Sequence, residues 1–151
     1  MARFTHPAIG SGGATSNDTW TIEGGTTGDG AVQPTFNGDP LFSGAWTRLG
    51  DLVFFNIDVD MDNITSFGSG QYYVKLPFPS QYNYLLSDGC IHDISTGDEY
   101  AILGHVSAGS DILTLLTTTS NSKQNPFTHN VPFTLNTADN FHISGSYTTA
   151  S

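Results

Sequence analysis

The sequence of 151 residues contains one cysteine, Cys90, and only four basic residues, and each shortage excludes a class of protein. A single cysteine excludes a disulfide within the chain and, by itself, supplies too few thiolates for a metal site. Fourteen acidic residues give a net charge of −10, which repels nucleic acid phosphates and anionic lipid. We therefore expect no nucleic acid partner and no membrane partner. The charge serves solubility or steers the protein toward a basic surface.

Long apolar runs and segments with helical periodicity are also missing. No apolar run approaches the length needed to cross a bilayer, and the N-terminal segment MARFTHPAIGSGG has no signal-peptide core. These absences predict a soluble protein made in the cytosol. No run of good helix formers repeats every 3.6 residues, whereas 17 glycines and 7 prolines occur among many threonines, serines and asparagines. This composition predicts short strands joined by turns.

The clearest strand prediction covers residues 52–63, with the sequence LVFFNIDVDMDN. Apolar and polar residues alternate there, and a period of two residues is typical of a strand with one buried face. The predicted buried face carries the apolar residues Val53, Phe55, Ile57, Val59 and Met61. The opposite face changes from apolar to acidic along the strand, in the order Leu52, Phe54, Asn56, Asp58 and Asp60. This change is expected where a partner covers one end.

Residues 1–33 are poor in aliphatic side chains and are predicted to form an extended N-terminal arm. The arm either folds back on its own domain or lies along another subunit, with Trp20 and Ile22 as its anchors. From residue 34 to residue 151, apolar segments recur about every ten residues between clusters of turn-forming residues. This spacing predicts an all-β head domain, an antiparallel β-sandwich of about eight strands.

Two predicted strands, at residues 52–55 and 112–116, are apolar on both faces. A monomeric sandwich would expose one of these faces as an apolar patch. We therefore predict that a neighbouring copy covers an oligomer interface formed by Leu52, Phe54, Leu113 and Leu115. A loop or the N-terminal arm is the alternative cover.

Asp58, Asp60 and Asp62 offer the only spacing that suggests a metal, because D-x-D-x-D begins a calcium-binding loop. The loop pattern then fails, since Asn63 stands where a glycine is needed and Ser69 where a glutamate is needed. We therefore favour an acidic edge that discourages aggregation between strands, and we expect no metal. The five histidines show no metal-binding spacing, although His105 and His142 would meet if their strands were neighbours.

Motifs for catalysis are absent from the sequence. There is no G-x-S-x-G motif, and the pair Cys90 and His92 has no glycine turn beside it that would stabilise an oxyanion. We predict neither enzymatic activity nor a cofactor. Carbohydrate binding stays open as an alternative, because aromatic residues in loops stack on sugars; the candidates are Tyr72, Tyr73, Phe78, Tyr82 and Tyr84.

Several phrases of the sequence resemble virion surface modules of tailed bacteriophages. Residues 44–53, GAWTRLGDLV, fit the pattern G-x-[YW]-x-R-x-G-[DN]-x-V of that family, and LPFP follows at residues 76–79. The segments DVDMDN, GSGQYYVKLPFPS, DGCIHDISTGDEYAILGHVSAGSD and TADNFHISGSY carry the rest of the resemblance, which extends over residues 34–147.

The resemblance implies a jelly-roll head of the C1q or tumour-necrosis-factor type that assembles as a homotrimer. It also implies a place on the virion surface, either as a capsid decoration protein or as a module at the tail tip. The chain has no coiled-coil heptads and no fibrous stalk, so we favour a decoration protein that clamps the major capsid protein. The alternative is a receptor-binding or minor tail protein that recognises a host-surface glycan or protein.

Overall fold

The computed structural model describes residues 16–20, 23–39, 41–118 and 123–149. Every regular element in this part of the chain is a strand, and it contains no helix. The all-β antiparallel class predicted from the sequence is therefore confirmed. The twelve strands are β1 (Ser16–Trp20), β2 (Gly24–Val32), β3 (Thr35–Phe36), β4 (Leu41–Leu49), β5 (Leu52–Asp60), β6 (Ile64–Ser66), β7 (Ser69–Lys75), β8 (Tyr84–Asp93), β9 (Asp98–Val106), β10 (Ile112–Thr118), β11 (Gln124–Pro126) and β12 (Asn140–Thr148).

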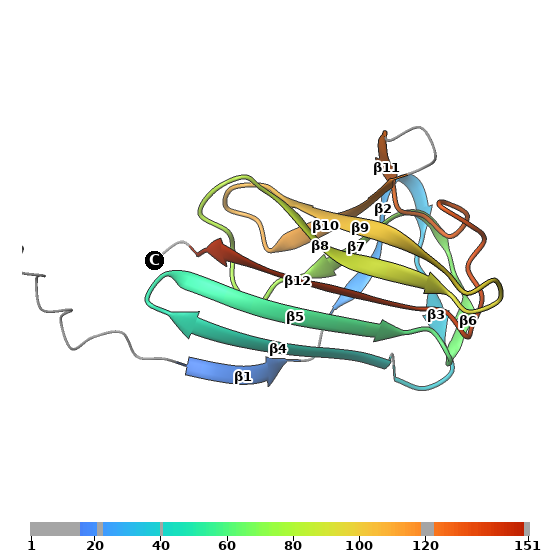
Figure 1. Ribbon diagram of the computed structural model, residues 1–151, viewed down its shortest axis with the longest axis horizontal. Coiled ribbons are helices and arrows are strands. Elements are labelled where there is room, and N and C mark those ends of the chain that lie inside the picture. Colours follow the sequence, from blue (N-terminus) through green and yellow to red (C-terminus); the bar gives the residue numbers. More distant parts are fainter. Residues whose placement is uncertain (1–15, 21–22, 40, 119–122, 150–151) are drawn as a thin grey trace, which may run out of the picture.

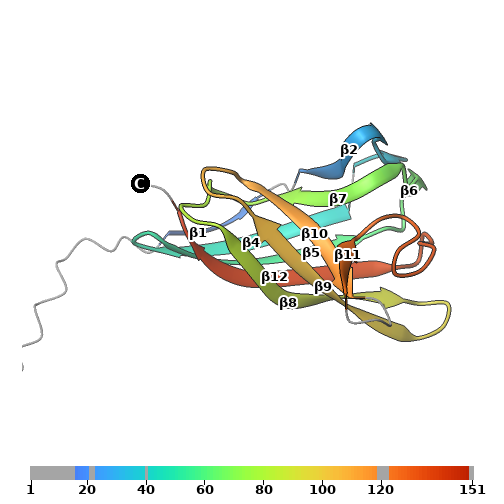
Figure 2. The ribbon, with the colours of Figure 1, turned by 90° about the horizontal axis from the view of Figure 1, so that it is seen from above.

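Ten of the strands form one sheet, in the order β1-β4-β5-β12-β8-β9-β10-β7-β2 with β11 beside β10. The sheet curls around the core, so that β2 and β7 at one end return toward β4 near the other end (Figure 1 and Figure 2). A Cβ atom on Gly24 of β2 would lie 3.3 Å from the Phe42 ring of β4. Glycine at this position therefore allows the two ends of the sheet to approach each other. The remaining strands, β3 and β6, pair as a separate ribbon.

Strand β5 has the alternation that the sequence predicted. Its inward side chains are buried, and they are Val53, Phe55, Ile57 and Val59. Its outward side chains are exposed, and they are Leu52, Phe54, Asn56, Asp58 and Asp60. Strands β4 and β12 pair with β5 along its full length. Their register with β5 therefore determines which side chains of β4 and β12 also face the solvent.

Strand β10 contradicts the interface prediction at two positions. Leu113 and Leu115 are fully buried in the core, so the prediction that they contact another copy is wrong. The strand pairs with β7 and β9 in a register that turns these two residues inward, while Ile112 and Leu116 on the opposite side are only half-buried. The run of apolar residues in the sequence did not distinguish the two sides.

The described part of the predicted arm folds back onto the head. Strand β1 pairs with β4, where Trp20 is opposite Gly44, and β2 pairs with β7. Residues 16–20 and 23–32 therefore belong to the same sheet as the head, and the predicted boundary at residue 33 does not separate them. The anchor Ile22 lies outside the described residues.

The outer edge of β2 is occupied by a side chain. The Gln33 carboxamide donates to the carbonyl oxygen of Thr26 through Nε2 at 2.7 Å and accepts from the Thr26 backbone N–H at 3.0 Å. These are the two hydrogen bonds that one residue of an adjacent antiparallel strand would make with Thr26. The Gln33 side chain therefore caps this edge of the sheet at Thr26.

Candidate functional site

The outer face of β4, β5 and β12, which is the side turned away from the core, is apolar at one end. Leu49 and Leu52 are register partners beside the turn at Gly50 and Asp51. The exposed fractions are 54% for Leu49, 38% for Leu52 and 47% for Phe54. The other register partners of Leu52 and Phe54 are small and uncharged: Thr47, Ser146 and Thr148. We call Leu49, Leu52 and Phe54 the apolar end of the outer face.

The other end of the outer face is acidic. Asp58 and Asp60 project there beside His142 and Asn140 of β12, around a shallow polar depression. Asp58 accepts a hydrogen bond from Asn56 at 3.3 Å. Asp60 accepts one at 2.9 Å from the backbone N–H of Asp62, which lies in the turn after β5. In the described residues, no three histidine, cysteine or carboxylate side chains lie close enough to hold a metal ion.

Strand order brings His142 next to Cys90, a contact that the sequence did not predict. The Cys90 Sγ atom lies 3.5 Å from His142 Nδ1, across the pairing of β8 with β12. Burial, and then the nearby Glu99 carboxylate, raise the pKa of the Cys90 thiol, which keeps it protonated and weakly nucleophilic at neutral pH. The predicted meeting of His105 with His142 does not occur, because His105 lies on β9 opposite Thr114 of β10.

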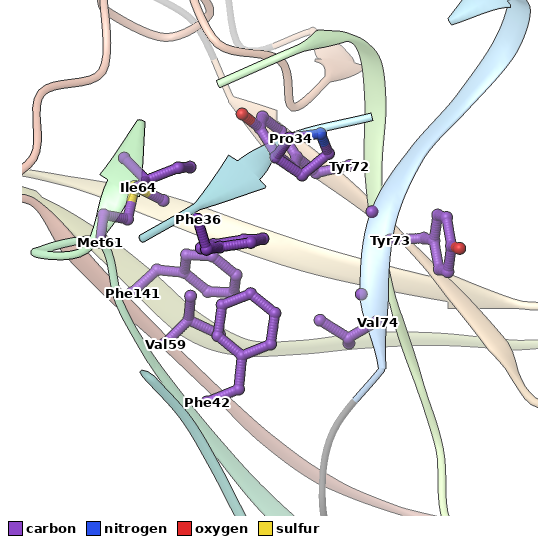
Figure 3. A pocket seen from close by; sticks show the side chains of 12 residues that line it. Pro34, Phe36, Phe42, Val59, Met61, Ile64, Tyr72, Tyr73, Val74 and Phe141 are labelled. Atoms are coloured by element: carbon purple, nitrogen blue, oxygen red, sulfur yellow. The ribbon is translucent and has the colours of Figure 1, made fainter. Parts of the chain in front are cut away.

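A small apolar cavity lies where the ribbon of β3 and β6 covers the core (Figure 3). The rings of Phe36, Phe42 and Phe141 surround it, and Tyr73 points away from them (Figure 3). Its free volume is about 20 Å³, and its lining is almost entirely apolar. A cavity of that size holds about one water molecule, and an apolar one stays empty. It is therefore a packing gap in the core and not a ligand site.

Comparison with known proteins gives no relative of this chain: no family, curated protein or solved structure matches it. Over the described residues, a search for helices that are long and apolar enough to cross a bilayer finds none.

Proposed function

We propose that this chain is a structural protein of a bacteriophage virion, a homotrimeric decoration protein on the head shell. The observation that carries the proposal is the exposed apolar end of the outer face, formed by Leu49, Leu52 and Phe54. Contiguous apolar side chains on an otherwise polar sheet are typical of a surface that another protein covers. The proposal includes a jelly-roll head, which the curled antiparallel sheet is compatible with, and the virion resemblance of residues 34–147.

Contact between copies through the apolar end is compatible with the high negative charge. Asp58 is four residues beyond Phe54, the nearest member of the apolar end, which is about 13 Å at the rise of a β-strand. That separation exceeds the Debye length of about 8 Å at physiological ionic strength. Copies that meet at Leu49, Leu52 and Phe54 therefore keep their acidic ends apart, where salt screens the repulsion.

The acidic end and the net charge of −10 favour a basic surface as the second partner. In this proposal the major capsid protein supplies that surface, and the trimer clamps neighbouring shell subunits. Arg48 pairs with Asp51 and Lys75 pairs with Glu23, and the four basic residues of the sequence are far outnumbered by its fourteen acidic residues. Attraction to the shell should therefore weaken as the salt concentration rises.

The trimer is tested by Phe54→Asp, measured by multi-angle light scattering of the purified full chain. We expect the wild type to have three times the 16.1 kDa mass of the chain and the variant to have the monomer mass. Loss of an apolar contact worth about 1.5–3 kcal/mol per copy, combined with three added charges, is enough to separate the copies. Asn140→Asp adds the same charge at the acidic end and should remain trimeric. A wild-type monomer, or a trimeric Phe54→Asp, would contradict the proposed interface.

The place on the particle is tested by counting copies per virion and by deleting the gene. A shell protein should be present in hundreds of copies, and particles without it should lose DNA more readily on heating while still adsorbing to cells. A few copies per particle, together with lost adsorption, would instead identify a receptor-binding protein at the tail tip.

A further inference from the structure

A second pocket lies between β4 and β7, on the side of the sheet opposite to the outer face. Its volume is about 340 Å³, which is in the lower part of the range for small-molecule pockets. Trp46 projects toward this side because its register partner on β5 is the buried Phe55. The lining residues come from four segments of the chain: Glu23, Trp46, Lys75, Leu76, Pro77, Phe78 and Asp111.

Two aromatic rings form an apolar corner in this pocket. The Trp46 and Phe78 rings have centroids 4.9 Å apart and planes at 84°. Phe78 is held in place by the buried Tyr147, whose hydroxyl donates to the Phe78 carbonyl at 2.9 Å and accepts from its N–H at 3.2 Å. Burial raises the pKa of Tyr147 to about 12, so the hydroxyl keeps its proton and both bonds at neutral pH. The Arg48 guanidinium also covers Phe78, 5.1 Å from the ring centroid. The corner is therefore fixed before any ligand arrives.

Polar groups stand beside this corner. The Lys75 ammonium forms an ion pair with Glu23, and these two residues are also joined by a backbone hydrogen bond of 2.8 Å. Among the described residues, the Asp111 carboxylate accepts no hydrogen bond, and the Trp46 indole N–H donates none. The residues that line the pocket thus include an unbonded carboxylate and an unbonded indole N–H, together with an apolar wall.

We propose that this pocket binds a hexose unit of a glycan. A pyranose ring has apolar C–H faces that pack on aromatic rings, and hydroxyl groups that both donate and accept hydrogen bonds. Hydroxyls would donate to Asp111 and accept from the Trp46 indole, and bonds to a charged partner are the stronger kind. This activity is additional to assembly, since the pocket and the apolar end use different residues on opposite sides of β4.

The lining argues against other classes of small molecule. A purely apolar ligand would take the Lys75–Glu23 ion pair out of water and would bury the Asp111 carboxylate without a hydrogen bond, which is costly. An anion would meet the two carboxylates, and a cation would meet the Lys75 ammonium with Arg48 nearby. A neutral ligand with several hydroxyl groups is the class that satisfies both the rings and the charges.

The test is an NMR titration of the ¹⁵N-labelled full chain with glucose, galactose, mannose and N-acetylglucosamine, each added separately. The reporter is the indole N–H signal of Trp46, assigned by its loss in Trp46→Phe. We expect a saturable shift of this signal with at least one of the four sugars. Asp111→Asn should weaken binding of that sugar about tenfold, because a charge-assisted hydrogen bond becomes a neutral one. Asp98→Asn, at the exposed start of β9 and away from the pocket, should bind as the wild type does.

Three results would overturn the proposal: no saturable shift with any of the four sugars, equal affinity in Asp111→Asn, or saturation by tetramethylammonium in place of a sugar. Unchanged backbone signals away from the pocket, and an unchanged mass in light scattering, would show that Asp111→Asn is folded and assembled as the wild type is. Failure of sugar binding would therefore be distinguishable from failure of the trimer.

Discussion

Leu115→Asp should leave no stably folded protein. Leu115 is fully buried on β10, between the neighbouring strands β7 and β9. Losing the burial of a leucine costs about 1.5–3 kcal/mol, and placing a carboxyl group in an apolar site without hydrogen bonds costs several more. The sum is comparable with the whole stability of a domain, about 5–15 kcal/mol. We expect the variant to accumulate in the insoluble fraction or to show no cooperative transition in a circular dichroism melt.

The same substitution at Leu52 is the matched control. Leu52 is 38% exposed on the outer face, so Leu52→Asp should stay folded, with a Tm within about 4 °C of that of Phe54→Asp, the other variant expected to be a monomer. Its effect should appear in light scattering, where the trimer mass is lost. A Leu115→Asp protein that melts cooperatively at the wild-type temperature would show that β10 does not turn this residue toward the core.

The second large effect is expected for Asp139→Ala. The Asp139 carboxylate is fully buried and accepts hydrogen bonds from the backbone N–H groups of Asn136 at 2.7 Å and Ile94 at 3.1 Å. It thereby joins the turn after β8 to the loop before β12. Alanine would remove two part-buried hydrogen bonds to a charged group, each worth about 1.5–3 kcal/mol. Urea denaturation should show a free energy of unfolding about 2–5 kcal/mol lower than that of the wild type.

Asp139→Asn retains one carbonyl oxygen and should lose a smaller part of this stability. Asp98→Ala removes an exposed carboxylate at the β8–β9 turn and should unfold at the wild-type urea concentration. If Asp139→Ala unfolds together with Asp98→Ala, the buried carboxylate does not hold the two loops.

The sequence predicted a strand and its buried side correctly where apolar and polar residues alternate. The residues of β5 alternate strictly, and both its buried and its exposed sides were predicted correctly. On β10 the residues Ile112, Leu113, Leu115 and Leu116 are apolar on both sides, so the inward side is set by the register with β7 and β9, which no local pattern encodes. Strands β1 and β2 were predicted only as parts of an arm, with folding back as one of two alternatives. β1 is mostly polar and β2 is rich in glycine, and both owe their place to pairing with β4 and β7.

In the candidate sites, too, residues placed by a local pattern could be predicted, and residues brought together by the fold could not. Leu52 and Phe54 could be placed on the exposed side from the alternation of one strand. Leu49 could have been added, because a tight turn at Gly50 and Asp51 puts it opposite Leu52. The pocket around Trp46 could not be predicted, since its residues come from segments that are brought together only when the sheet curls and its two ends approach.

The Gln33 carboxamide limits the addition of strands from other molecules at the β2 edge of the sheet. A strand from a neighbour that tried to extend the sheet beyond β2 would find the Thr26 backbone already bonded. Addition of another strand at this point of the β2 edge is thereby blocked, because its hydrogen-bonding groups are already occupied.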